Sequence, residues 1–186
     1  TNRLIHLIRD LEQLIRLESI SRLEASQIEL KPFFANLSLI LEPDIQAKGL
    51  SLSVELEEGL DRMVCDPFRF EQIFINLVQN SLRYTDTGGI TIHVGKEGEN
   101  IVFTISDTGR GIQNEHLDRI FERFYVADNS RNRDFSGTGL GLAIVKHIVV
   151  LHHGEISVSS EMGRGTTFRI SIPPLAERKN ESNQPS

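Results

Sequence analysis

The chain has 186 residues, of which 39% are hydrophobic and 25% are charged, which is an ordinary composition for a globular domain. No apolar run approaches the ~20 residues of a membrane span, and a net charge of −6 argues against broad nucleic-acid binding, which needs a basic face. The single cysteine, Cys65, excludes an internal disulfide and a cysteine-rich zinc site, and it is consistent with a reducing compartment.

The first segment, residues 1–30, is predicted to form one helix. Its apolar residues recur at a spacing of three or four, at Leu4, Leu7, Leu11 and Leu14, and Ile8 and Ile15 widen this apolar stripe. A lone helix with such a stripe needs a second helix or a second copy of the chain, unless it packs on its own domain. The chain begins at Thr1 without an initiator Met or a signal-peptide pattern, so we expect a piece of a longer protein.

Lys31-Pro32 is expected to end this first helix. The later elements, read from apolar periodicity and turn residues, are helix 33–47 with a disturbance at Pro43, strands 50–56 and 63–65, helix 67–84, strands 90–94 and 101–105, helix 140–151, and strands 155–160 and 166–172. Asp66 and Pro67 suit the N-cap and first position of the helix that follows them, and its predicted core face is Phe70, Ile73, Phe74, Leu77 and Ser81. Residues 95–100 are predicted as a hairpin loop, and the polar end of the chain as a disordered tail.

The order of these elements favours an α+β fold. Helices and strand pairs do not alternate as βαβ units, so a doubly wound parallel sheet is disfavoured. A mixed sheet with helices on one face fits the order better, preceded by the N-terminal helix.

Polar residues form a stripe on the predicted helix 67–84. Asn76, Asn80 and Arg83 share one side of the helix, with Tyr84 at its edge. An asparagine carbonyl is a hard oxygen ligand that suits Mg²⁺, and an arginine complements phosphate. The stripe therefore predicts one wall of a phosphate and metal site, and the alternative is a solvated polar face.

A carboxylate stands at the end of the predicted strand 101–105. Asp107 is followed by Gly109 and Gly111, which would let a flat ligand approach the backbone. An ionised carboxylate accepts hydrogen bonds, so it suits a donor such as the amino group of adenine. Asp-Thr-Gly is also a common turn, which is the alternative reading.

A third stretch, residues 137–142, is rich in glycine and opens a helix. Its backbone N–H groups and the helix dipole suit an anion. It lacks the Lys-Ser or Lys-Thr of a P-loop, and no βα turn matches a dinucleotide fingerprint. Phe121–Tyr125 and the irregular, charge-mixed run up to Ser136 precede it, and this long segment predicts a lid, with a plain surface loop as the alternative.

Together these stretches resemble the ATP-binding catalytic domain of bacterial sensor histidine kinases, over residues 31–174. The boxes that carry the resemblance are the N box 76–85, the first glycine box 107–111, the F box 121–125, the second glycine box 137–142 and the closing stretch 163–168. Residues 1–30 are similar to the second helix of the family's dimerisation and phosphotransfer hairpin, and residues 175–186 remain as the tail.

The resemblance implies a two-layer α/β sandwich of the Bergerat type that binds ATP and Mg²⁺. Asn80 is the implied metal ligand, Asn76 and Arg83 the catalytic residues, and Asp107 the residue that binds the adenine amino group. The other implied nucleotide-binding residues are Tyr84, Gly109, Gly111, Ile112, Arg131, Gly137, Thr138, Gly139, Leu140, Gly141 and Thr166. Val126 stands where many members have a basic residue, and Arg131 is a candidate substitute, with Arg123 and Arg133 as alternatives.

Asn76 also bears on the reaction. Hydrolytic relatives in the superfamily carry a glutamate there, and asparagine cannot act as a general base at neutral pH. The resemblance therefore implies transfer of the γ-phosphoryl of ATP to a histidine. None of the six histidines lies in the family's acceptor motif, so the histidine is expected on a helix outside this sequence, in the same or a sister chain.

The resemblance also implies a setting for the longer parent protein. We expect that parent to be a homodimer, to pass the phosphoryl group to a response regulator, and to act in the cytoplasm, with a membrane anchor as a further expectation. No nucleic-acid partner and no membrane contact by this segment are expected. The alternatives are a non-catalytic module that binds nucleotide or a partner, and a hydrolytic ATPase, which Asn76 argues against.

Overall fold

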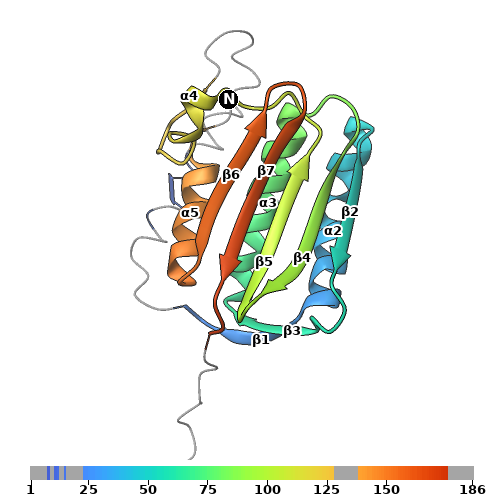
Figure 1. Ribbon diagram of the computed structural model, residues 1–186, viewed down its shortest axis with the longest axis vertical. Helices are drawn as coiled ribbons and strands as arrows, with labels where there is room; N and C mark the ends of the chain where they lie inside the picture. Colours follow the sequence, from blue (N-terminus) through green and yellow to red (C-terminus); the bar gives the residue numbers. More distant parts are fainter. Residues whose placement is uncertain (1–7, 9–10, 13–14, 16–22, 128–137, 176–186) are drawn as a thin grey trace, which may run out of the picture.

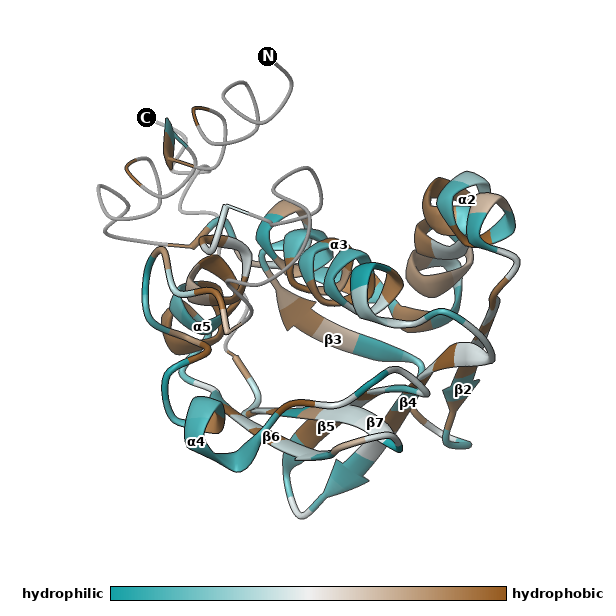
Figure 2. Ribbon diagram, turned by 90° about the horizontal axis from the view of Figure 1, so that it is seen from above, coloured by the Kyte–Doolittle hydropathy of each residue, from teal (hydrophilic) through white to brown (hydrophobic). Residues whose placement is uncertain are grey.

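The computed structural model describes residues 8, 11, 12, 15, 23–127 and 138–175. In this part of the chain a five-stranded sheet forms one layer, and α2, α3 and α5 cover one of its faces (Figures 1 and 2). The elements are β1 (Ser26–Glu29), α2 (Leu30–Lys48), β2 (Ser51–Leu56), β3 (Arg62–Cys65), α3 (Pro67–Tyr84), β4 (Gly89–Glu97), β5 (Asn100–Asp107), α4 (Asn114–Leu117), α5 (Gly141–Leu151), β6 (Glu155–Glu161) and β7 (Gly165–Ile172). The predicted α+β class, with helices on one face of the sheet, is confirmed.

The sheet is mixed, as predicted. Its strand order is β2-β4-β5-β7-β6, and β2 pairs with β4 in parallel while the other pairs are antiparallel. In the pairing of β5 with β7, Asp107 at the end of β5 lies opposite Thr166 at the start of β7. This register brings two predicted site residues together although 59 positions separate them.

α3 lies between the sheet and solvent and contributes six of the buried hydrophobic residues of the core. Its N-cap is Asp66, whose side chain accepts a hydrogen bond from the N–H of Arg69, and Pro67 fills the first position, as predicted. The predicted core face of the helix is buried throughout: Phe70, Ile73, Phe74, Leu77 and Ser81. The ring centroid of Phe74 lies 5.0 Å from that of Phe34 on α2, and the ring centroid of Phe70 lies 5.1 Å from that of Phe103 on β5. Aromatic packing therefore joins α3 to both elements.

The prediction of one helix over residues 1–30 is wrong at its end. Ile8, Leu11, Glu12 and Ile15 are helical, but Ser26–Glu29 form β1, which pairs antiparallel with β3 at one end of the molecule (Figure 1). The next helix, α2, begins at Leu30, so Pro32 lies in its first turn. Backbone N–H groups in the first turn have no partner within the helix, and the missing N–H of a proline therefore costs nothing there.

Two other predictions, the hairpin loop 95–100 and the disturbance of the second helix at Pro43, differ from the structure. The predicted loop 95–100 shrinks to a two-residue turn, because β4 runs on to Glu97 and β5 begins at Asn100. α2 also continues through Pro43 as one helix. Of the predicted tail, only Leu175 lies among the described residues. No helix in the described part of the chain is both long and apolar enough to cross a membrane.

Candidate functional site

Asp107 is held in place by three hydrogen bonds from three different parts of the chain. Its Oδ1 accepts from the backbone N–H of Gly109 at 2.9 Å and from that of Thr166 at 3.2 Å. Its Oδ2 accepts from the hydroxyl of Ser81 on α3 at 2.9 Å. The side chain is buried, with 8% of the residue exposed. The carboxylate is therefore set at the junction of β5, β7 and α3 before any ligand arrives.

The glycines of the first glycine box are required by contacts within the protein. A Cβ at Gly109 would lie 2.6 Å from the carbonyl oxygen of Tyr84, and one at Gly111 would lie 2.3 Å from that of Glu161. Gly111 also has a φ of +76°, which disfavours other residues. Contacts within the chain therefore already require glycine at both positions, and the expectation that these glycines make room for a flat ligand stays a prediction.

A chain of hydrogen bonds connects Asp107, through Thr166, to Ser160 on β6. Thr166 is buried, and its hydroxyl lies 3.0 Å from that of Ser160. The Ser160 hydroxyl also accepts from the N–H of Ile112 at 2.8 Å. The structure therefore places Ile112, Thr166 and Asp107 in one connected cluster, as their assignment to one pocket requires.

The predicted polar stripe lies on α3, where Asn76 and Asn80 are half-buried and Arg83 is exposed. The Nδ2 of Asn76 donates to the carbonyl of Gln72 at 2.8 Å, and its Oδ1 lies 3.0 Å from where a Cβ on Gly141 would be. Asn76 thus faces the start of α5. The ring of Tyr84 lies under the guanidinium of Arg110, 4.7 Å from the ring centroid, so it is fixed from the side of the first glycine box.

The second glycine box is described from Thr138 onward. Gly139 has a φ of +72°, and its carbonyl accepts from the N–H of Phe124 at 2.9 Å. The N–H of Leu140 donates to the Thr138 hydroxyl at 3.3 Å, and the Leu140 side chain is fully buried ahead of the first turn of α5. Arg131 and Gly137, which were assigned to the same site, lie outside the described residues.

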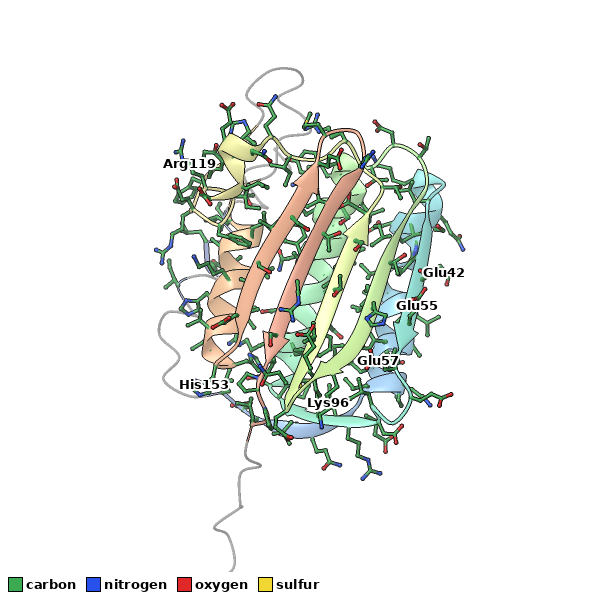
Figure 3. All side chains as sticks on the ribbon, viewed as in Figure 1. Glu42, Glu55, Glu57, Lys96, Arg119 and His153 are labelled. Carbon is green, nitrogen blue, oxygen red and sulfur yellow. The ribbon has the colours of Figure 1, made fainter. Side chains whose placement is uncertain are left out.

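The F box packs one of its aromatic side chains against the core and exposes another to solvent. The ring of Phe121 lies 6.4 Å from that of Phe168 in the core, whereas Phe124 is 56% exposed. Tyr125 is held by two contacts: its hydroxyl is 2.7 Å from Nδ1 of His116, and its ring lies under Arg119, which is labelled next to α4 in Figure 3. The N–H of Phe124 donates to the carbonyl of Gly139, so the F box and the second glycine box are joined directly.

The sequence family described as histidine kinase-, DNA gyrase B- and HSP90-like ATPase matches residues 65–176. The chain belongs to this ATPase family. The match spans α3, the first glycine box and α5, so it includes every element that lines the site.

Known proteins similar to this ATPase-family chain include sensor histidine kinases. The circadian input-output histidine kinase CikA of Synechococcus elongatus is 33% identical over 98% of this chain. The structure of full-length ShkA in complex with AMPPNP has a TM-score of 0.82 and 26% identity over 94% of this chain and 37% of that one. The histidine kinase AdeS of Acinetobacter baumannii has a TM-score of 0.76 and 29% identity over 93% of this chain and 79% of that one. The chain spans about a quarter of the length of CikA (26%).

The side chains of this ATPase-family site suit a nucleotide with a divalent cation. Carbonyl oxygens are hard ligands of the kind that Mg²⁺ takes, and the amides of Asn76 and Asn80 supply them on one helix face. The bond from Nδ2 of Asn76 to Gln72 orients the side-chain amide so that its Oδ1 lies toward Gly141 at the start of α5. The side-chain amide of Asn80 makes no hydrogen bond to another described residue.

Two residues of the site were not assigned from the sequence. Ser81 was placed in the core face of α3, which is correct, but its hydroxyl also bonds to Asp107. A buried polar group needs a partner, so a serine in an otherwise apolar stripe was the sign that could have found it. Arg110 offered no comparable sign, because its stacking on Tyr84 depends on the tertiary fold.

Proposed function

We propose that this chain is the catalytic segment of a two-component sensor histidine kinase, which binds Mg²⁺-ATP and transfers the γ-phosphoryl group to a histidine on another helix. The observation that carries the proposal is the buried carboxylate of Asp107, held by three donors beside the amide-bearing face of α3. A carboxylate acceptor next to a helix with amide oxygens can bind a purine amino group and a phosphate-bound cation in one hollow.

Each residue has a separate task in this proposal. Asp107 accepts a hydrogen bond from the adenine amino group, and Gly109, Gly111, Ile112 and Thr166 shape the pocket around it. Asn80, assisted by Asn76, holds Mg²⁺, which would neutralise phosphate charge when bound. Arg83 adds a positive charge, and the backbone at the start of α5 faces the phosphates with Thr138, Gly139, Leu140 and Gly141. Tyr84 assists at the cation and phosphates, and Arg131 and Gly137 complete the set of nucleotide-binding residues that the resemblance implies.

Asn76 supports transfer rather than hydrolysis. Its amide nitrogen is already bonded to the carbonyl of Gln72, and an amide oxygen does not take a proton from water at neutral pH. Water in the site would thus lack a base, and the phosphoryl group is kept for a better nucleophile. Catalysis then consists of positioning and charge neutralisation, as in phosphoryl transfer generally.

The acceptor and the other partners belong to the longer protein in this proposal. Residues 1–30 contribute part of the phosphotransfer hairpin, residues 31–174 the catalytic domain, and residues 175–186 a tail, with β1 joining the catalytic domain through its pairing with β3. Ile8, Leu11 and Ile15 are helical and 37–58% exposed, which suits pairing with a partner helix in a homodimer. A response regulator would receive the phosphoryl group, and the need for ATP favours a cytoplasmic location for the domain.

Nucleotide titration of two variants tests the site. Asp107→Asn and Asn80→Ala are expected to weaken Mg²⁺-ATP binding at least about tenfold. Asp107→Asn loses a hydrogen bond to a charged group, which contributes roughly 1.5–3 kcal/mol, and Asn80→Ala loses the amide oxygen proposed as the Mg²⁺ ligand. Asp44→Asn and Asn36→Ala, on the exposed side of α2, are the matched controls and should bind as the unaltered chain does. Affinity equal to that of the unaltered chain in both site variants would overturn the assignment.

A reaction in trans tests the activity. The chain is mixed with ATP labelled at the γ-phosphate and a separately made helical-hairpin protein that carries an acceptor histidine. Acid-labile label on the hairpin is expected, since phosphohistidine is acid-labile. Nucleotide binding without any labelled histidine would indicate a binding module instead, and steady release of inorganic phosphate would indicate a hydrolytic ATPase.

A further inference from the structure

Ser81 makes an unusual hydrogen bond for a serine within a helix. It lies in the buried face of α3, with 1% of the residue exposed, among apolar neighbours. A serine in a helix often bonds back to the carbonyl four residues earlier, as Ser38 on α2 does to Phe34 at 2.8 Å. The hydroxyl of Ser81 instead reaches across to β5 and donates to Oδ2 of Asp107 at 2.9 Å.

This bond determines how much of the Asp107 carboxylate is left for a ligand. An ionised carboxylate has about four acceptor positions, two on each oxygen. The N–H groups of Gly109 and Thr166 occupy both positions of Oδ1, and Ser81 occupies one position of Oδ2. A single acceptor position, on Oδ2, remains for one further N–H donor.

The same bond also fixes the orientation of the carboxylate. The terminal torsion of an aspartate side chain is broad when nothing restrains it. The two backbone donors hold Oδ1, and Ser81 holds Oδ2 from the opposite element, so the carboxylate plane is set before binding. A ligand that meets an acceptor already oriented loses less entropy on binding than one that must order it.

We propose that Ser81 is a positioning residue for base recognition, whose hydroxyl aims the one free acceptor position of Asp107 at a single exocyclic amino group of a purine. The inference rests on the proposed function, in which Asp107 binds the base. It extends that function by assigning the selection of a 6-aminopurine to a pair of side chains, Ser81 and Asp107, instead of to the carboxylate alone. Ser81 acts only through the bond between Asp107 and the amino group.

The test compares two nucleotides that differ in that amino group. Equilibrium affinities for ATP and for purine riboside triphosphate, which lacks the 6-amino group, are measured for the unaltered chain and for Ser81→Ala. We expect Ser81→Ala to weaken ATP binding about 3- to 10-fold, the range of one hydrogen bond, and to leave the affinity for the analogue unchanged. Ser38→Ala, which removes the helix-internal serine bond of α2, is the matched control and should change neither affinity.

Ser81→Cys serves as a second variant with nearly the same shape as the serine and a much weaker donor. It should reproduce the selective loss of ATP affinity, and thermal melts show that each variant is folded. Equal weakening of both nucleotides would mean that Ser81 acts by packing, and no change for either would mean that the bond is irrelevant to binding; each result would overturn the inference.

Failure of the proposed function gives a different pattern. If the unaltered chain binds ATP and the analogue equally, or if Asp107→Asn binds ATP as well as the unaltered chain does, Asp107 does not read the amino group. Both proposals then fall together. If instead the unaltered chain prefers ATP and loses that preference in Asp107→Asn, while Ser81→Ala keeps it in full, only the role of Ser81 is lost.

Discussion

The buried histidine at the end of α5 makes the stability of the domain depend on pH. His152 is fully buried, its Nδ1 lies 2.8 Å from the carbonyl of Ile148, and its Nε2 accepts from the N–H of Asp66 at 3.1 Å. One ring nitrogen therefore donates and the other accepts, which is the pattern of a neutral imidazole. A second proton on Nε2 would face a donor and lose this bond.

Burial lowers the pKa of His152 below its ordinary value of 6.5, although the bond to Ile148 and the charge of Asp66 act in the opposite direction. The unfolded chain thus binds the proton more readily than the folded chain does. The contribution to stability is complete above pH 6.5 and is lost as the pH falls from 6.5 toward the lowered pKa of the folded state. Between pH 7.5 and 5.5 one such group removes at most about 1.4 kcal/mol from the free energy of unfolding.

Urea unfolding at pH 7.5 and 5.5 measures this loss. The free energy of unfolding of the unaltered chain should fall by up to about 1.4 kcal/mol more than that of His152→Gln, since the variant retains all other titrating groups. His153→Asn is the control, because His153 is exposed at the outer end of α5 (Figure 3) and its φ of +57° is one that asparagine tolerates. Equal losses in the unaltered chain and in His152→Gln would refute the reasoning, whatever the absolute stability of the variant.

Three further outcomes follow from single contacts. Asp66→Ala should lower the free energy of unfolding by about 1 kcal/mol in urea titrations, because α3 loses its N-cap. Burial, followed by the charge of Asp66, raises the pKa of Cys65 to about 12, so a thiol reagent at pH 8 should label the native chain far more slowly than the urea-unfolded chain. Gly139→Ala should destabilise the fold more than Gly163→Ala: both glycines have positive φ, but only at Gly139 would a Cβ meet backbone, 2.6 Å from the carbonyl carbon of Phe124. Equal urea midpoints for the two alanine variants would contradict this.

Local patterns predicted the elements whose causes are local. α3 follows from its apolar spacing together with Asp66 and Pro67 at its start, and the structure has all three features as expected. The strand pair β6 and β7 likewise follows from alternation around a glycine-containing turn. The polar stripe of Asn76 and Asn80 was predictable for the same reason, since residues four apart on a helix share a face.

Features that depend on distant parts of the chain could not be read in this way. Ser26–Glu29 become a strand because they pair with β3, about 36 residues later, and nothing in their own sequence distinguishes them from the end of a helix. The bond of Thr166 to Asp107 depends on the register of β5 with β7, and the bond of Ser81 to Asp107 depends on how α3 lies across the sheet. The sequence motifs identified residues of the site, but their hydrogen-bond partners depend on strand register and helix packing, which the motifs do not encode.

α3 is fixed to the rest of the domain at two buried polar positions, and the amide face lies between them. At its start, the N–H of Asp66 bonds to His152, the C-cap of α5, while near its end Ser81 bonds to Asp107 of β5. Fifteen residues separate Asp66 from Ser81, about 22 Å along a helix, and Asn76 and Asn80 fall within that interval. A helix held at one point can still pivot about it, but a helix held at two cannot slide or turn without breaking a buried bond, which costs about 1–3 kcal/mol. The distance between the amide oxygens and the Asp107 carboxylate is therefore a property of the folded domain, set before nucleotide arrives.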